Sequence, residues 1–430
     1  MSDSTGTPDA TATSSATTAS AVATLVDTGF FSDADFDFAA RNALGAAGQG
    51  VIDPGLVLAT LARITDGDSD SWYAAWKPVA DQLLAQAEAA LAAGHDETAA
   101  GAFLAASEAY SNAIGFASGM ADQTLFAPAF ALHRKTFDAF VDASGARFER
   151  LAVPYEGDTL PGYILRPDAS GAPRPTLVLT NGSDGSITSM WTSGAATAVA
   201  RGWNAVVYDG PGQQSMLFDR GTHFRPDWEA VLTPVVDTLV ARPDVDPDRL
   251  FAYGISQAGY WLPRALAFEK RFVAAVADPG VVDVSTSWTS NLPAVLIELL
   301  KSGDSADFNG AMQEAHADPV LDRTLAWRST PYGTSTDFDA FTAVLAYALG
   351  DLAATITTPL LITEPEGEQF WPGQSQQLHD ALTGLAADDK VIAHFTKAEG
   401  ADFHCQPLGR GATEARMFDF FDEHLARVGR

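Results

Sequence analysis

The sequence is poor in cysteine and in basic residues. Its single cysteine, Cys405, cannot form a disulfide within the chain and cannot build a cysteine metal cluster. Lys and Arg number 26 against 55 Asp and Glu, which gives a net charge of −29. Such a surface repels phosphate backbones and anionic lipids, so we expect neither nucleic acid nor a membrane as a partner. One thiol also suits a reducing compartment, and we predict a cytoplasmic protein.

Long apolar runs are missing as well. No stretch approaches the ~20 residues that span a bilayer, and no basic residue precedes an apolar run at the N-terminus, as it would in a signal peptide. Residues 1–24 are rich in Ser, Thr and Ala and are predicted to form a disordered head. The whole chain is nonetheless 47% hydrophobic, which is ample for a large core. No His, Asp or Glu cluster has metal-ligand spacing, so neither a metal nor another cofactor is expected.

The spacing of apolar residues divides the chain into two parts. Between residues 25 and 146 they recur every three or four positions, as from Trp76 to Leu91, which predicts a helical cap domain. From residue 147 to 430, short continuous apolar runs alternate with helix-length segments. Strands buried on both faces of a sheet have this pattern. We therefore predict an α/β catalytic domain, with a mostly parallel sheet and helices on both faces.

The positions of the expected strands also reveal an insertion between two of them. Residues 147–167 predict two strands around a Gly-Asp turn. The parallel strands are expected at residues 175–180, 204–209, 249–254, 273–278, 359–363 and 390–396. The fourth and fifth of these runs are separated by about 80 residues, too many for a simple crossover. We expect a helical lid insertion at about residues 280–357.

The strongest chemical signal is the run Gly254-Ile255-Ser256-Gln257-Ala258. It follows a predicted strand and precedes a predicted helix. This is the context of a nucleophile elbow, a sharp turn that lifts a serine oxygen above the sheet. The turn needs small neighbours, and Ala258 is small enough to replace the usual glycine. Ser256 is therefore the predicted nucleophile, and the alternative is a glycine-rich turn with an incidental serine.

A serine nucleophile needs an adjacent base, which in this arrangement follows the last core strand. His404 is the one histidine after Ser256 that lies in a loop just past that strand, and it is the predicted base. The others are predicted in the lid insertion, in a helix, in a strand and in the terminal helix: His316, His379, His394 and His424. A surface loop histidine is the alternative for His404. Cys405 beside it is interpreted as a small packed residue.

Three carboxylates compete for the acid that orients the histidine. Glu366 and Glu368 follow the seventh strand, the usual place for the acid. Many hydrolases place the acid nine residues after a strand proline and four before another proline. Pro359 and Pro372 both select Glu368 by these offsets. Asp278 ends the sixth strand, where some enzymes of this fold carry the acid. Glu368 is favoured, and Glu366 and Asp278 stay open.

Acyl transfer also needs hydrogen-bond donors for the developing oxyanion. The backbone N–H of Gln257, next to the nucleophile, is the first expected donor. The second should come from the loop Asn181–Gly185, where two glycines let the backbone approach a substrate closely. From its position in that loop, Ser183 is the residue expected to provide the second backbone N–H donor. A second glycine-rich turn, residues 209–215, is interpreted as structural, because no Gly-Lys-Ser/Thr follows it.

In their order and spacing, several segments resemble the FrsA-like esterases of the α/β-hydrolases and the neighbouring group with dihydroxypseudooxynicotine hydrolase and fungal polyketide-shortening hydrolases. The segments are VPYEGDTLPGYILRP, NGSDGS, DGPGQQS, YGISQAGYW, EGEQFWPGQ and EGADFHC. The resemblance implies a triad of Ser256, Glu368 and His404, with Glu368 where Asp is usual. It also implies that the N-terminal helices pack over the catalytic domain and help to enclose the pocket. Gln214 stands where that family often has glycine.

Together these features predict a serine hydrolase that cleaves a small, partly apolar acyl substrate through an acyl-serine intermediate. The bond is an ester or a carbon–carbon bond beside a ketone. The alternatives are an acyltransferase or other non-hydrolytic enzyme, an aminopeptidase-like enzyme and an inactive binding protein. The predicted partner is a small-molecule substrate, with a homodimer possible. The two helical regions supply aromatic residues for a roof over the nucleophile, although aromatic residues at helical spacing more often form a core: Trp72, Trp76, Tyr110, Trp288 and Phe308.

Overall fold

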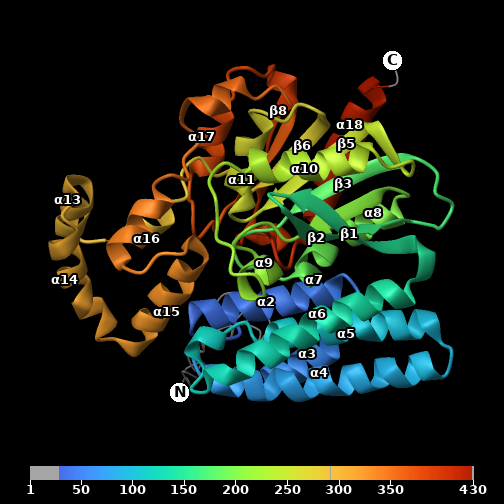
Figure 1. The fold of residues 1–430 in the computed structure, drawn as a ribbon, viewed down its shortest axis with the longest axis horizontal. Coiled ribbons are helices and arrows are strands. Elements are labelled where there is room, and N and C mark those ends of the chain that lie inside the picture. Colours follow the sequence, from blue (N-terminus) through green and yellow to red (C-terminus); the bar gives the residue numbers. More distant parts are fainter. Residues whose placement is uncertain (1–28, 291, 429–430) are drawn as a thin grey trace, which may run out of the picture.

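The structure, a computed structural model, describes residues 29–428 except residue 291 (Figure 1). The predicted disordered head lies outside the described residues. At the centre is an eight-stranded sheet in the order β1-β2-β4-β3-β5-β6-β7-β8. Its strands are β1 (Phe148–Tyr155), β2 (Asp158–Leu165), β3 (Arg174–Thr180), β4 (Asn204–Tyr208), β5 (Val245–Ile255), β6 (Phe272–Asp278), β7 (Leu360–Pro365) and β8 (Lys390–Phe395).

Most neighbouring strands run parallel. The pairs β1–β2 and β2–β4 are antiparallel, and the other five are parallel. The hairpin between β1 and β2 turns through Glu156 and Gly157, which have φ angles of 46° and 85°. Two successive left-handed residues give the tight turn that matches the twist of paired strands. Every predicted strand is thus present, in a mostly parallel sheet.

Both faces of the sheet are covered by helices. Successive side chains of a strand point to opposite faces, and since both sets are apolar here, both faces must be buried. On β3, Leu177 and Leu179 belong to one core cluster and Val178 to the other. The helices of the catalytic part are α7 (Ile187–Met190), α8 (Ala196–Ala200), α9 (Gln214–Phe218), α10 (Glu229–Val240), α11 (Ala258–Leu266), α17 (Gln374–Ala381) and α18 (Arg410–Val428). Side chains of α10, α11 and α17 fill the core on one face, and those of α8 and α18 fill the core on the other.

A layer of five described helices precedes the sheet: α2 (Ala34–Gly48), α3 (Pro54–Leu61), α4 (Ser69–Ala92), α5 (Asp96–Ala113) and α6 (Phe126–Ala143). Figure 1 shows them stacked along one side of the catalytic part. Phe103 on α5 and Phe137 and Phe140 on α6 join the core that α8 and α18 line. The helical part is therefore packed directly on the sheet. Among the described residues, no helix has the combination of length and apolar character needed to cross a bilayer.

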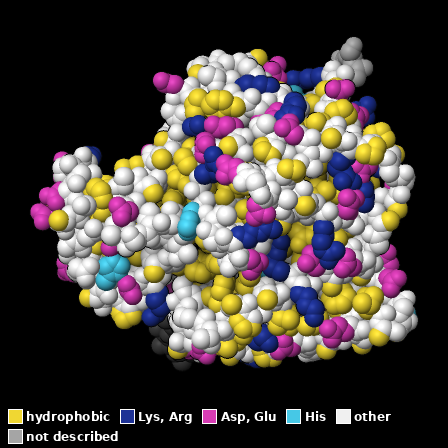
Figure 2. Space-filling view, in the orientation of Figure 1, with side chains coloured by type: hydrophobic (Ala, Val, Ile, Leu, Met, Phe, Trp, Pro, Cys, Tyr) yellow, Lys and Arg dark blue, Asp and Glu magenta, His cyan; other side chains and the backbone are white. Residues whose placement is uncertain are grey.

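Between β6 and β7 the chain forms a separate group of helices, which we call the lid insertion. It contains α12 (Thr286–Thr289), α13 (Ala294–Ser302), α14 (Ser305–His316), α15 (Pro319–Ser329) and α16 (Asp337–Val344). In Figure 1 its helices project from one edge of the molecule. On the face shown in Figure 2, acidic and basic side chains are interspersed and form no single basic patch. The predicted fold class, including the N-terminal helical domain and the lid insertion, is confirmed.

The aromatic residues considered for a roof are core residues instead. Trp72, Trp76 and Tyr110 are at most 1% exposed and form the core of the helical part. Trp288 and Phe308 pack in the core that joins the lid insertion to the catalytic part. Helical spacing of aromatic residues is the same for a core as for a pocket wall, so the sequence pattern could not distinguish the two.

Candidate active site

Ser256 stands in the sharp turn between β5 and α11. Its φ angle is 57°, in the left-handed region that non-glycine residues adopt only when their surroundings hold them there. Close packing explains the small residues of the motif. A Cβ on Gly254 would lie 2.5 Å from the carbonyl oxygen of Ala258, and one on Gly259 would overlap the carbonyl of Pro279. The turn has the strained strand–turn–helix geometry predicted for a nucleophile elbow.

Ser256, His404 and Glu368 form one chain of hydrogen bonds. His404 Nε2 lies 2.9 Å from Ser256 Oγ, and His404 Nδ1 lies 2.9 Å from Glu368 Oε2 and 3.0 Å from Oε1. His404 is 3% exposed. An ionised carboxylate only accepts hydrogen bonds, so the imidazole carries its proton on Nδ1 and leaves Nε2 free to accept from the serine hydroxyl. The structure thus brings the three residues favoured by the sequence into contact.

Glu368 is held in place by more than the histidine. Its Oε1 accepts hydrogen bonds from the backbone N–H groups of Phe370 at 2.9 Å and Trp371 at 3.1 Å. Burial raises the pKa of Glu368, but the imidazole of His404 and these N–H groups outweigh burial and hold the pKa below its ordinary value. The carboxylate is therefore charged at neutral pH.

The two competing carboxylates have other partners. Asp278 is fully buried and accepts hydrogen bonds from Tyr253 Oη at 2.6 Å, Thr363 Oγ1 at 2.5 Å and Arg410 Nη1 at 3.1 Å. Glu366 is exposed and accepts from the backbone N–H of Lys397 at 3.0 Å. Within residues 29–428, apart from residue 291, neither carboxylate is hydrogen bonded to His404.

Asp278 instead supports the loop that carries His404. Gln406 Nε2 donates to Asp278 Oδ1 at 3.0 Å, and Arg410 Nη1 donates to the carbonyl of Cys405 at 3.0 Å. Cys405 and Gln406 have φ angles of 56° and 45°, so this loop is strained and depends on such contacts. Burial raises the pKa of the Cys405 thiol, which agrees with its interpretation as a packed residue. Sequence reasoning missed Gln406 and Arg410, because nothing in the local sequence marks their buried partner.

The loop after β3 lies against the nucleophile. A Cβ on Gly182 would be 2.7 Å from Ser256 Cβ and 3.2 Å from Ser256 Oγ. The Gly182 N–H is occupied, since it donates to Asn181 Oδ1 at 2.8 Å. By contrast, the N–H groups of Ser183 and Gln257 donate no hydrogen bond within the part of the chain that the structure describes. Both expected oxyanion donors are therefore unoccupied.

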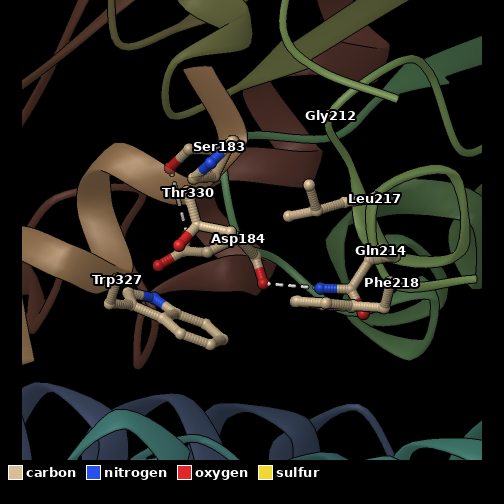
Figure 3. Close-up of a pocket in the computed structure, with 9 residues that line it drawn as sticks. Ser183, Asp184, Gly212, Gln214, Leu217, Phe218, Trp327 and Thr330 are labelled. Carbon is tan, nitrogen blue, oxygen red and sulfur yellow. Dashed lines mark hydrogen bonds between the residues drawn. The ribbon is translucent and has the colours of Figure 1, made fainter. Parts of the chain in front are cut away.

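The turn at residues 209–215, interpreted as structural, braces this loop. Gln213 Nε2 donates to the carbonyls of Asn181 at 2.6 Å and Gly182 at 2.9 Å. Gln214 Nε2 donates to the carbonyl of Asp184 at 2.8 Å, a contact drawn in Figure 3. Sequence reasoning missed the role of the two glutamines, although a pair of amides after a glycine-rich turn was a visible signal.

A pocket opens beside this loop (Figure 3). Its lining comes from the loop after β3, from the segment around α9 and from the lid insertion: Ser183, Asp184, Gly212, Gln214, Leu217, Phe218, Trp327, Thr330 and Pro331. Ser256 is not in the lining. One lining residue, Ser183, follows Gly182, which lies against Ser256.

Aromatic rings gather around one side of the pocket. Phe218 stacks on Trp327 with ring centroids 5.9 Å apart, and Phe126 lies 4.7 Å from Phe218. These rings come from the lid insertion, from α9 and from α6, so all three parts of the molecule meet there. Among the described residues, no three His, Cys, Asp or Glu side chains converge as a metal site.

Comparisons with known proteins bear on the fold and the family of the chain. The model of the prolyl oligopeptidase family matches residues 230–427, which include Ser256, Glu368 and His404. Over 413 residues the chain is 31% identical to "Hydrolase LUC6" of Fusarium sp, covering 91% of this chain and 97% of that protein. The chain belongs to the α/β-hydrolase superfamily.

This hydrolase is similar to further proteins over nearly its full length. It is 27% identical over 420 residues to "20-hydroxy-prefusarin hydrolase FUS2" of Gibberella moniliformis, covering 92% of this chain and 98% of that protein. The crystal structure of the 2,6-dihydroxy-pseudo-oxynicotine hydrolase has the same fold, with a TM-score of 0.70 at 18% identity, over 89% of this chain and 96% of that one. The chain is thus an enzyme of the hydrolase class.

Proposed function

We propose that this hydrolase cleaves a small, partly apolar acyl compound through a covalent acyl-Ser256 intermediate. The observation that carries the proposal is the hydrogen-bonded chain from Ser256 through His404 to Glu368. A serine hydroxyl is a weak nucleophile until an adjacent base accepts its proton. The strained turn at Ser256 and the buried, ionised Glu368 are the two features that such a chain requires on either side of its histidine.

Each atom of the site has a role in the proposed reaction. Ser256 Oγ attacks the carbonyl carbon while its proton passes to His404 Nε2, and Glu368 stabilises the imidazolium that forms. The carbonyl oxygen becomes an oxyanion, to which the free N–H groups of Gln257 and Ser183 donate hydrogen bonds. The imidazolium then protonates the leaving group. Water then attacks the acyl-serine while His404 takes its proton, and the imidazolium returns this proton to Ser256 Oγ as the acid leaves.

The pocket supports a small substrate rather than a long one. Leu217, Phe218 and Trp327 offer an apolar wall, while Ser183 and Gln214 offer polar groups. Specific small-molecule sites combine apolar walls with a few polar groups in this way. The names of two relatives, hydrolases of 20-hydroxy-prefusarin and of 2,6-dihydroxy-pseudo-oxynicotine, also refer to small molecules. The substrate is an ester, or a ketone with a cleavable carbon–carbon bond.

An aminopeptidase-like activity is the second candidate, because the prolyl oligopeptidase model matches the catalytic part of the chain. The two candidates share the nucleophile and differ in the leaving group. A peptide chain needs an open groove, whereas this pocket is closed on one side by the lid insertion.

The proposal is tested by labelling and by a substrate panel. A fluorophosphonate should label the native enzyme but neither the heat-denatured enzyme nor Ser256→Ala. The panel contains short aryl esters, 1,3-diketones and peptides, and Ser256→Ala should lower turnover by about 10³-fold or more. Native-like labelling of Ser256→Ala would exclude the nucleophile. Cleavage of peptides alone would replace the small-acyl proposal with the peptidase.

A further inference from the structure

One face of α2 lies along the loop that carries His404. Phe38, Arg41, Gly45 and Gln49 follow one another at intervals of three or four residues, so they share one side of the helix. Each contacts the histidine loop or the start of α18. The Phe38 ring lies 6.2 Å from the His404 ring, measured between centroids, and Arg41 Cζ lies 4.1 Å from the centroid of the Phe403 ring.

The other two positions continue the same contact. A Cβ on Gly45 would overlap the carbonyl oxygen of Pro407, so the helix backbone rests directly on the loop. Gln49 Nε2, at the end of α2, donates to Glu414 Oε2 at 3.2 Å. The contact therefore extends from Phe38 to the C-terminal end of α2.

The contact between α2 and the histidine loop lies next to the strained residues of that loop. Cys405 and Gln406 hold left-handed φ angles, which a loop keeps only when its surroundings fix it. Asp278 and Arg410 fix the loop from within the catalytic part. On the outer side, Phe38 lies against His404 itself.

Phe38 also joins the loop that carries the acid. Its ring lies 6.3 Å from that of Phe370, which lies 4.7 Å from the His404 ring. The imidazole is thus enclosed by one ring from α2 and by Phe370 and Trp371 from the acid loop.

From this we infer that α2 is a positioning element for His404, in which Phe38 and Gly45 hold the imidazole on Ser256 Oγ. The inference rests on the proposed function of His404 as general base. Two hydrogen bonds of 2.9 Å must be kept at once, one to Ser256 and one to Glu368. A misplacement of about 1 Å in such an arrangement costs about 10²-fold in rate. The helical part thereby contributes to the chemistry as well as to packing.

A matched pair of glycines on α2 tests the inference. Gly45 is buried against Pro407, whereas Gly48 is exposed, and a Cβ added there would meet nothing within 4 Å. Alanine raises intrinsic helix propensity at either position, but only Gly45→Ala pushes α2 off the histidine loop. The readout is the second-order rate of inactivation by diisopropyl fluorophosphate, a reagent small enough to report activation of Ser256 without filling the pocket.

We expect Gly45→Ala to be inactivated about tenfold more slowly than the wild type, and Gly48→Ala at the wild-type rate within twofold. Circular dichroism and melting temperature establish that both variants are folded. Equal inactivation rates for a folded Gly45→Ala and the wild type would overturn the inference and leave the proposed function intact. Labelling of Ser256→Ala would instead contradict the proposed function, in which Ser256 is the nucleophile.

A second pair keeps the test valid if Gly45→Ala does not fold. Phe38→Ala should lower kcat by about tenfold and leave KM within twofold, because the ring lies beside the imidazole and its loss acts on the chemical step. Phe38→Leu should restore most of the lost kcat, since a large apolar side chain again covers the imidazole. A rise in KM at unchanged kcat would assign Phe38 to substrate binding and overturn its positioning role.

Discussion

Replacing Glu368 with glutamine tests how the site selects the tautomer of its histidine. Glutamine keeps the shape of the side chain and removes its charge. The amide oxygen should remain on the N–H groups of Phe370 and Trp371, which now contact Oε1 at 2.9 and 3.1 Å. The amide nitrogen then takes the place of Oε2, 2.9 Å from His404 Nδ1.

In this orientation the amide NH₂ donates to Nδ1 and cannot accept, which favours the tautomer that carries its proton on Nε2. The amide oxygen in the place of Oε1 lies 3.0 Å from Nδ1 and still accepts from the other tautomer, but the negative charge that stabilises the imidazolium is lost. A protonated Nε2 cannot take the proton of Ser256. Loss of the correct tautomer lowers kcat by about 10⁴-fold in serine proteases with the same chain of groups. We expect a fall of about 10³- to 10⁴-fold for Glu368→Gln, equivalent to about 4 to 5.5 kcal/mol of transition-state stabilisation.

The assay is steady-state hydrolysis of a short aryl ester at neutral pH, with a melting temperature for each variant. Glu366→Gln is the matched control, because Glu366 lies in the same loop, is exposed and contacts a backbone N–H away from His404. It should keep kcat within twofold. A folded Glu368→Gln that retained more than a tenth of the wild-type kcat would refute the reasoning and remove Glu368 from the catalytic chain.

Three further predictions follow from other contacts. Asp278→Asn leaves a buried guanidinium without its carboxylate and should destabilise the fold by about 3–5 kcal/mol in urea unfolding; an unchanged midpoint would contradict this. The hydrogen bonds that the His316 ring donates to Asp337 and Asp322 raise the pKa of His316 in the lid insertion. The contribution of these contacts to the stability of the fold is therefore complete below the ordinary histidine pKa of about 6.5, and it is lost as pH rises through the raised pKa of His316. His316→Gln should lower the melting temperature more at pH 5.5 than at pH 9, and the opposite order would refute the pairing. Trp327→Ala should raise KM about tenfold with little change in kcat, and an unchanged KM would place the substrate elsewhere.

Much of the fold could be predicted because its signals are local. A strand buried on both faces must be a short apolar run, and each such run after residue 170 became a strand. The turn at Ser256 needs small residues at fixed offsets, so its sequence is readable without the rest of the chain. His404 was found by its place after the last strand.

Sequence spacing reduced the candidates for the carboxylate partner of His404 to three, but only the three-dimensional packing shows which of them contacts the histidine. Glu366, Glu368 and Asp278 are all carboxylates next to strand ends, and the spacing to nearby prolines favours Glu368 without showing that its side chain faces His404. The fold pairs Asp278 with Arg410, 132 residues away, and thereby removes it from the histidine. Glu368 is left beside Nδ1 because the backbone of Phe370 and Trp371 fixes its carboxylate.

By itself, the sequence determined which segments become strands and helices, and it marked Ser256 and His404, because those features depend on neighbours along the chain. Only the tertiary structure decided that the aromatic residues Trp72 and Trp76 form a core, and that α2 rests on the loop of His404. Periodicity records that a helix has an apolar face but not what that face meets. The partner of a buried face is selected by the packing of the whole chain, and the enclosure of His404 by α2 is a product of that packing.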